Sequence, residues 1–201
     1  HVQTINGVER HMTEVEGEEV IEFLRGVEPG RPFCLIWCPW APHADDSDPK
    51  QYFWPPAVDA LYRDVDIPVP EMAAPEYYEA QPPFLKNTMS RTRWGWRFDT
   101  PEKYQRMVKG YYRMISGIDL VLGRIRGELA RLGLDGNTVI IYTSDNGYFL
   151  GERGYADKWL MYDLSIRVPL VVYDPRAPHA SRGLVKRDMV LNIDLGPTLM
   201  D

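Results

Sequence analysis

The alternation of helical and strand patterns along the chain predicts an α/β fold. The first observation is a long amphipathic stretch over residues 100–132, and the second is a set of apolar, β-branched runs over residues 33–37, 138–143 and 168–173. Helices that alternate with buried strands pack against a sheet, and connections between parallel strands are right-handed. With 201 residues, the chain is long enough for one domain with a sizeable core.

Composition narrows the class of protein. A hydrophobic content of 44% and an aromatic content of 12% indicate a folded chain rather than a disordered one. The net charge of -6 provides no basic surface for nucleic acid, so we expect no nucleic-acid partner. No apolar run has the length of a membrane span, and His1 begins no signal-peptide pattern.

The N-terminal region predicts a short helix followed by a buried strand. Thr13 and Glu16 have the spacing of a capping box, and the helix that they open is stopped by Gly26. The strand follows at residues 33–37. Cys34 and Cys38 lie four positions apart along this apolar segment, about 13 Å from each other at a strand rise of ~3.3 Å per residue, so they do not pair. We interpret both as small, buried core residues.

Residues 45–98 are rich in proline and aromatic residues and have no sustained period, which is typical of a functional loop or insertion. At its end, arginines are interleaved with tryptophans at Arg91, Arg93, Trp94, Trp96 and Arg97. Flat rings beside cations suit the faces of sugars and their anionic groups. The alternative is that these tryptophans belong to the local core.

The long helix has clear signals at both ends. Thr100 is a good N-cap, Pro101 fits the first helical position, and Gly133 ends the helix. Between them, apolar residues recur every three or four positions and form one stripe. The chain then turns into the predicted strand of residues 138–143.

Asp145, Asn146 and Gly147 directly follow that strand. Taken alone, Asp-Asn-Gly is typical of a turn, in which Asp and Asn tolerate left-handed backbone and Gly supplies a positive φ. The alternative is a metal site, because a carboxylate and a carboxamide are oxygen ligands that suit a hard cation. In open α/β sheets, ligands collect beyond the carboxyl ends of strands, where His43 also lies.

Several motifs occur in order along the chain: RPFCLIWCPWAPH at residues 31–43, SDNG at 144–147, LGERG at 150–154, Lys158, and SIRVPL at 165–170. Together they resemble the C-terminal part of the catalytic domain of the type I sulfatase family, within the alkaline-phosphatase superfamily. The resemblance implies an alkaline-phosphatase-like sandwich, with helices packed on a largely parallel mixed sheet. Residues 1–201 would form a partial domain, with residues 45–98 as a substrate-loop insertion.

The resemblance also implies a site. Asp145 and Asn146 would be two ligands of a Ca²⁺ ion, with Mg²⁺ the less favoured metal. His43 and Lys158 would contact the sulfate group and the leaving oxygen, one of them acting as general acid. Arg153 stands where many relatives have histidine; it would bind an anionic group or lie on the surface beside a turn.

The family nucleophile is formylglycine, made in a Cys-x-Pro-x-Arg motif, and neither cysteine of this chain has that context. The resemblance places this motif before His1, so we expect residues 1–201 alone to be inactive. By analogy the substrate is a sulfated small molecule or carbohydrate, in a periplasmic, extracellular or lysosomal-type compartment. A cytoplasmic location and the oligomeric state stay open.

Two alternative functions remain at this point. One is a phosphatase, phosphodiesterase or phosphonate hydrolase of the same superfamily, which often uses additional histidine and aspartate ligands. Only four histidines occur here, and His43 and His179 have no paired metal-binding spacing. The other is a non-catalytic calcium-binding module or a pseudoenzyme. The sequence before His1 would separate these alternatives.

Overall fold

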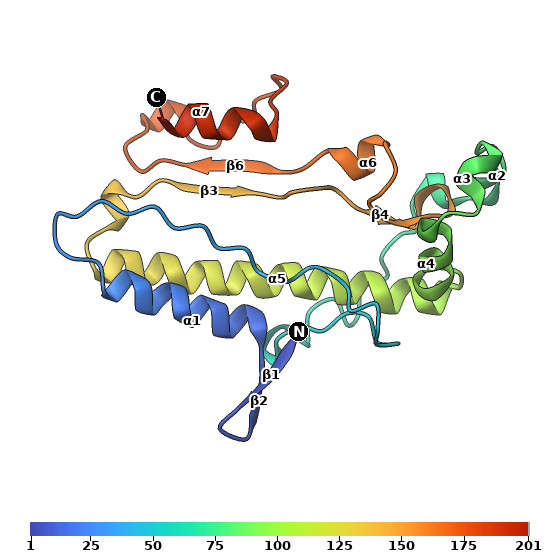
Figure 1. Ribbon diagram of the computed structural model, residues 1–201, viewed down its shortest axis with the longest axis horizontal. Helices are drawn as coiled ribbons and strands as arrows, with labels where there is room; N and C mark the ends of the chain where they lie inside the picture. Colours follow the sequence, from blue (N-terminus) through green and yellow to red (C-terminus); the bar gives the residue numbers. More distant parts are fainter. Residues whose placement is uncertain (201) are drawn as a thin grey trace.

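The computed structural model of the protein describes residues 1–200, which are arranged in layers around one long helix, α5 (Pro101–Arg131) (Figure 1). Helix α1 (Met12–Arg25) packs along α5, and the strands β3 (Ile140–Thr143) and β6 (Leu170–Tyr173) lie on the other side of α5. The C-terminal helix α7 (Leu195–Met200) lies beyond β6. Helices and strands therefore alternate as layers, as an α/β fold requires.

The remaining elements are short. They are β1 (Val2–Ile5), β2 (Val8–His11), β4 (Phe149–Leu150), β5 (Ala156–Asp157), α2 (Pro75–Glu79), α3 (Pro83–Lys86), α4 (Met89–Arg97), α6 (Asp163–Ile166), and single 3₁₀ turns at η1 (Pro56–Val58), η2 (Glu71–Ala73), η3 (Asp135–Asn137), η4 (Glu152–Gly154), η5 (His179–Ser181) and η6 (Asn192–Asp194). Residues 45–98 thus contain five short helices rather than irregular chain throughout. The longest of the five, α4, contacts both β5 and α5.

The predicted long helix is confirmed at both ends. The Thr100 hydroxyl accepts a hydrogen bond from the Lys103 backbone N–H at 3.2 Å, and Pro101 is the first helical residue. Gly133 follows the C-cap with a φ of 69°, a conformation that glycine adopts without steric cost. These local signals were sufficient because helix capping depends only on neighbouring residues.

The capping box expected for α1 is wrong. The helix begins at Met12, and the side chain of His11 is the N-cap, with its Nδ1 accepting from the Thr13 backbone N–H at 3.3 Å. Strand β2 leads directly into the helix, so His11 occupies the position that the capping box assigned to Thr13. The Thr13 hydroxyl is buried and has no hydrogen-bond partner among residues 1–200. Gly26 follows the helix as predicted.

Helices α1 and α5 share one apolar cluster. Val20, Ile21 and Leu24 of α1 are buried against Val121, Ile125 and Leu129 of α5. The two backbones approach closely at Gly17, where a Cβ atom would lie 2.2 Å from Val121 Cγ1. Phe33, Trp37 and Ile140 pack on the same cluster, so it joins the helical layer to the coil of residues 26–39 and to β3. This contact is one of two apolar cores among the described residues.

Strands β3 and β6 form an antiparallel pair, with Ile140 opposite Tyr173 and Thr143 opposite Leu170. The right-handed parallel crossover expected between the strands is therefore wrong for this pair. Residues 33–37 run extended along α5 but pair with no strand in the described part of the chain, so the predicted strand there is also wrong. A strand needs a hydrogen-bonded neighbour, and this segment has none.

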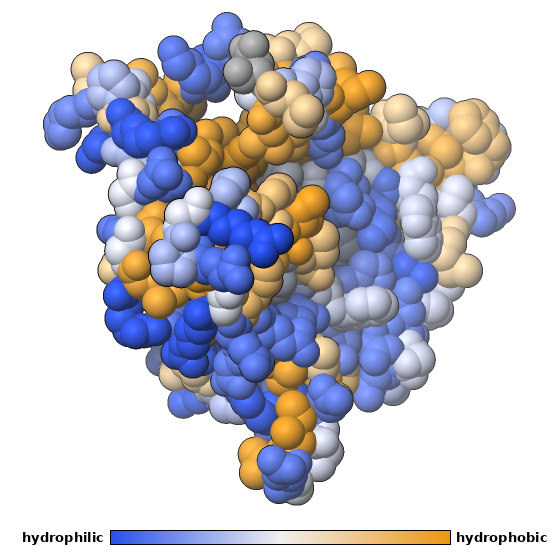
Figure 2. Space-filling model, turned by 60° about the vertical axis from the view of Figure 1, so that its left-hand side comes forward, coloured by the Kyte–Doolittle hydropathy of each residue, from blue (hydrophilic) through white to orange (hydrophobic). Residues whose placement is uncertain are grey.

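The prediction that Cys34 and Cys38 are buried core residues is wrong as well, because both thiols are free and exposed. Apolar side chains are exposed beside them, with Ile36 at 82% exposure, and all four residues of β6 are exposed. Figure 2 shows apolar surface in the upper part of the molecule, where β6 and α7 lie. None of the helices within residues 1–200 combines the length and the apolar character that a membrane crossing needs.

A prediction concerns Glu128, whose ion pair with Arg25 joins α5 to α1. Glu128 of α5 accepts hydrogen bonds from Arg131 at 2.6 Å and from Arg25 of α1 at 2.7 Å, and these hold its pKa at about 2. Because the pKa in the folded state lies below the ordinary 4.5, Glu128 stabilises the fold fully above pH 4.5. This stabilisation is lost as the pH falls from 4.5 to about 2.

We therefore expect Glu128→Gln to lower the melting temperature of the full-length protein at pH 7, with the difference from wild type shrinking below pH 4.5. Circular dichroism melts from pH 7 down to pH 3 would measure this. Glu19→Gln is the matched control, because Glu19 is an exposed carboxylate of α1. A difference that stays constant over this pH range would contradict the prediction.

Candidate functional site

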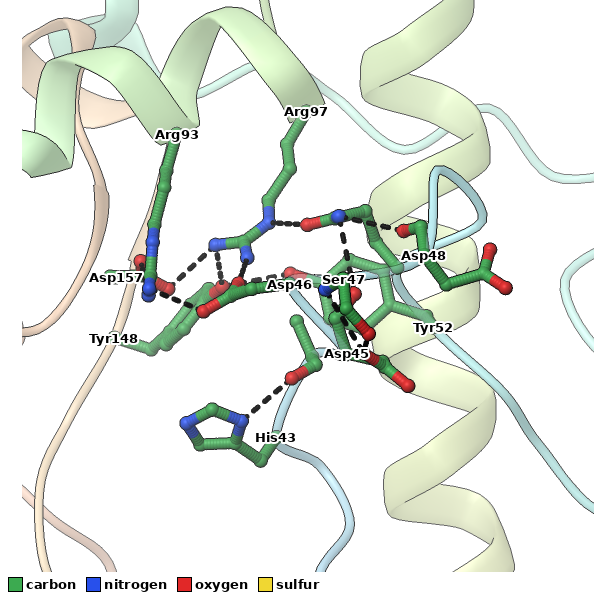
Figure 3. A network of polar contacts seen from close by, with 12 residues as sticks. His43, Asp45, Asp46, Ser47, Asp48, Tyr52, Arg93, Arg97, Tyr148 and Asp157 are labelled. Carbon is green, nitrogen blue, oxygen red and sulfur yellow. Dashed lines mark hydrogen bonds and ion pairs between the residues drawn. The ribbon is translucent and has the colours of Figure 1, made fainter. Parts of the chain in front are cut away.

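The predicted catalytic and metal-binding residues lie on three loops. His43 follows the extended segment of residues 31–39, Asp145 and Asn146 follow β3, and Lys158 follows β5. The helix α4 lies over these loops and directs two arginine side chains towards them (Figure 3). The contacts described below connect all three loops.

The imidazole of His43 is exposed and held on one side. Its Nδ1 atom lies 2.7 Å from the Ala44 carbonyl oxygen, which only accepts, so Nδ1 carries the proton that is donated. The His43 backbone N–H donates to the Trp40 carbonyl oxygen at 3.0 Å, which closes a turn before the imidazole. The ring therefore has Nε2 left for a substrate.

The loop of residues 144–147 leaves two oxygens available. Asp145 Oδ1 accepts from the Asn146 backbone N–H at 2.9 Å, and Asn146 Nδ2 donates to the Gly147 carbonyl oxygen at 2.8 Å. Asp145 Oδ2 and Asn146 Oδ1 accept no hydrogen bond from any described residue. Their chemistry fits a hard cation such as Ca²⁺, which takes six to eight oxygen ligands. Residues 1–200 contain no group of three or more His, Cys, Asp or Glu placed to hold a metal.

Gly147 is needed for close approach and not for a positive φ, so the turn interpretation of this glycine is wrong. It is absent from the described residues with positive φ, and a Cβ atom there would lie 2.2 Å from the Leu164 carbonyl oxygen and 2.6 Å from that of Arg167. Its backbone N–H donates to the Ser165 carbonyl oxygen at 2.8 Å. The Ser165 hydroxyl in turn donates to the Lys158 carbonyl oxygen. Ser165 therefore joins the loop of Asp145 and Asn146 to Lys158.

A second connection is made by four charged side chains, Asp46, Arg93, Arg97 and Asp157, which we name the four-charge cluster (Figure 3). Asp157 accepts from Arg93 at 2.5 Å and from Arg97 at 2.6 Å, and Asp46 pairs with both arginines. The side chain of Arg97 is fully buried, and that of Asp157 is 5% exposed. Two positive and two negative charges balance, as buried ions require.

Arg97 also bonds to neutral partners. Its Nε donates to Gln51 Oε1 at 2.7 Å, and one terminal nitrogen donates to the Tyr148 hydroxyl at 3.0 Å. The Tyr148 and Tyr52 hydroxyls lie 2.8 Å apart. Burial raises the pKa of Tyr52 to about 12 and raises the pKa of Tyr148 well above its ordinary value. Both phenols therefore keep their protons at neutral pH.

The other predicted substrate contacts have different surroundings. Arg93 is occupied by the two carboxylates of the four-charge cluster. Trp94 is partly buried against the core, whereas Trp96 is 42% exposed. Arg153 lies 5.2 Å from the ring of Tyr162 and has no carboxylate partner in the described part of the chain. Substrate binding by these residues stays a prediction.

The sequence did not predict the four-charge cluster. Arg93 and Arg97 are four positions apart, which places them on one face of a helix, but residues 45–98 were expected to be irregular. Two further signals were available. Asp46 comes three residues after His43, and Asp157 immediately precedes Lys158.

Comparison with solved structures first shows the fold. The solved structure of BT4656 with its substrate D-glucosamine-2-N,6-O-disulfate has a TM-score of 0.64 at 22% identity, over 86% of this chain and 45% of that one. A phosphonate monoester hydrolase from Silicibacter pomeroyi has a TM-score of 0.65 at 22% identity, over 86% of this chain and 35% of that one. The alkaline-phosphatase-like α/β fold predicted from the sequence is thus confirmed.

The sequence comparisons then define the family. The sulfatase family model matches residues 2–201, so this chain belongs to the sulfatase family. An arylsulfatase from Clostridium perfringens is 30% identical over 192 residues, which are 95% of this chain and 38% of that protein. An N-acetylglucosamine-6-O-sulfatase from Bacteroides thetaiotaomicron is 38% identical over 99 residues, 49% of this chain and 17% of that protein. The chain therefore spans well under half the length of these relatives.

Proposed function

We propose that the full-length protein hydrolyses sulfate monoesters and that His43, Lys158, Asp145 and Asn146 belong to its active site. One observation carries the proposal: the three loops that bear these residues are joined by specific contacts. Ser165 joins the Asp145 loop to Lys158, and the four-charge cluster joins the His43 loop to Lys158. Membership of the sulfatase family supports the same assignment.

The chemistry of a sulfate ester explains why these residue types are suitable. The leaving oxygen gains negative charge as its bond to sulfur breaks, so catalysis needs a proton or a positive charge at that atom. The Lys158 ammonium group supplies charge. His43 donates its Nδ1–H to the Ala44 carbonyl, so it delivers a proton from Nε2 when the ring is in the doubly protonated imidazolium form. When bound at Asp145 and Asn146, Ca²⁺ would supply further positive charge to the sulfate oxygens. We infer that formylglycine, the nucleophile, lies elsewhere in the full-length protein.

We infer further that the substrate is a sulfated carbohydrate. The N-acetylglucosamine-6-O-sulfatase relative supports this class. In this chain, the exposed ring of Trp96 offers a face for a sugar, and Arg153 offers a cation for a second anionic group. A phosphonate monoester is the second candidate substrate, because a phosphonate hydrolase has an equally similar fold. Parallel assays with a sulfated glucosamine and a phosphonate monoester separate the two.

Loss of either proposed leaving-oxygen contact should slow the chemical step. In the full-length protein, we expect His43→Ala and Lys158→Ala each to lower kcat for a sulfate ester by about 100-fold or more, with the fold retained. His179→Ala and Lys186→Ala are the matched controls, since both residues are exposed and lie outside the three loops. Near-normal turnover by both variants would remove these residues from the mechanism.

The metal assignment has its own test. Because Asp145 and Asn146 are oxygen donors, we expect the full-length protein to bind Ca²⁺ in preference to Zn²⁺, with Mg²⁺ the less favoured alternative. Elemental analysis should find stoichiometric calcium in the wild type and reduced calcium in Asp145→Ala. Asp188→Ala, at an exposed aspartate, should leave the content unchanged. Stoichiometric zinc that persists in Asp145→Ala would contradict this assignment.

We infer that residues 1–201 expressed alone are inactive and poorly folded. The chain contains no Cys- or Ser-x-Pro-x-Arg motif, and its β6 strand exposes Val171 and Val172 at 57% and 58%. Such apolar strands associate unless another surface covers them, so we expect an insoluble, molten or oligomeric product. A soluble monomer with a cooperative melt would contradict the folding part of this inference. Sulfatase activity that Asp145→Ala abolishes would contradict the catalytic part.

A further inference from the structure

We propose that Arg97 is a positioning residue that fixes the three loops of the candidate site relative to one another. The proposal rests on the proposed function, because that function gives the three loops their roles. Arg97 itself is fully buried, so a substrate does not reach its guanidinium group. Its effect on catalysis would therefore pass through the residues that it binds.

Each loop contributes one partner to the same guanidinium group, and Figure 3 shows these partners around it. Asp46 binds one terminal nitrogen and lies three residues after His43. Tyr148 and Asp157 both bind the other terminal nitrogen, at 3.0 Å and 2.6 Å. Tyr148 comes two residues after Asn146, and Asp157 immediately precedes Lys158. One side chain thus contacts residues close in sequence to His43, Asn146 and Lys158.

Two of the partners have an unfavourable backbone conformation. Gln51, which accepts from Arg97 Nε, has a φ of 64°, and Asp157 has a φ of 71°. Residues other than glycine adopt this left-handed region only when their surroundings hold them there. Arg97 binds the side chains of both residues, and Arg93 also binds Asp157, so the loss of Arg97 should leave Asp157 less firmly held. A relaxation of Asp157 would displace Lys158, the next residue along the chain.

The arrangement requires an arginine rather than any cation. The planar guanidinium group directs donors from three nitrogens, whereas a lysine ammonium is a single point that does not span the same partners. Arg93, one helical turn earlier on α4, provides a natural comparison. It pairs with Asp46 and Asp157, as Arg97 does, but it makes no bond to Tyr148. Arg93 therefore connects two of the three loops, and Arg97 connects all three.

The experiment compares Arg97→Lys with Arg93→Lys in the full-length protein by hydrogen–deuterium exchange. In Arg97→Lys, we expect faster exchange in residues 43–48, 144–148 and 155–158 together. In Arg93→Lys, exchange should rise in residues 43–48 and 155–158 only. Ile125→Val, in the apolar cluster between α1 and α5, controls for general loss of stability and should change none of the three segments.

Kinetics provide the second measurement. Arg97→Lys should lower kcat by about 100-fold, as small displacements of catalytic groups do, with a much smaller change in KM. Equal changes in kcat and KM, or exchange that rises uniformly over the whole protein, would overturn the positioning role. If Arg97→Lys does not fold, Tyr148→Phe removes only the hydroxyl that accepts from Arg97. Faster exchange confined to residues 144–148 would then support the proposal, and unchanged exchange would overturn it.

The two proposals fail in different ways. A wild-type protein that hydrolyses neither a sulfate ester nor a phosphonate ester would refute the proposed function. The exchange pattern of Arg97→Lys would still decide whether this residue holds the three loops together. Conversely, an active wild type with no change in the three segments on Arg97→Lys would refute the positioning role alone.

Discussion

The four-charge cluster beneath α4 constrains how α4 and the loops of the candidate site assemble. Arg97 has no access to water, and an ion in that position is tolerated only when opposite charges and hydrogen bonds replace its hydration shell. Its carboxylate partners come from before and after α5 in the sequence, at Asp46 and Asp157. The helix, the loop of His43 and the segment of Lys158 must therefore assemble together, because any one of them alone would bury an unbalanced charge.

Local features of the fold were accessible from the sequence, whereas pairing was not. The cap at Thr100 and the apolar stripe gave α5 correctly, since both depend on residues within a few turns of each other. Apolar runs correctly predicted strands at β3 and β6. No pattern within a strand specifies which strand lies beside it, so the antiparallel pairing was not predicted. The same limit explains residues 33–37, which have strand-like composition and no strand beside them in the described chain.

The candidate site likewise contains residues that the sequence predicts and residues that only the tertiary structure reveals. His43, Asp145, Asn146 and Lys158 were predicted from short motifs that resemble those of the sulfatase family, and their roles stay predictions. The positioning role proposed for Arg97 could not be predicted in this way, because it depends on partners at positions 46, 51, 148 and 157, which only the tertiary structure brings together. Arginine and tryptophan residues at the end of the irregular segment were predicted to face a substrate. The structure gives Arg93 two carboxylate partners inside the protein, and its contact with a substrate stays a prediction.

The two tightest glycines of the chain differ in what surrounds them, and this difference bears on how the sequence can evolve. At Gly17 the obstructing atom belongs to the side chain of Val121, so a larger residue at position 17 becomes acceptable once position 121 becomes smaller. At Gly147 the obstructing atoms are backbone carbonyl oxygens of Leu164 and Arg167, which every amino acid carries. Positions 17 and 121 are thus free to drift as a pair over generations, whereas no second substitution at 164 or 167 relieves a side chain at position 147.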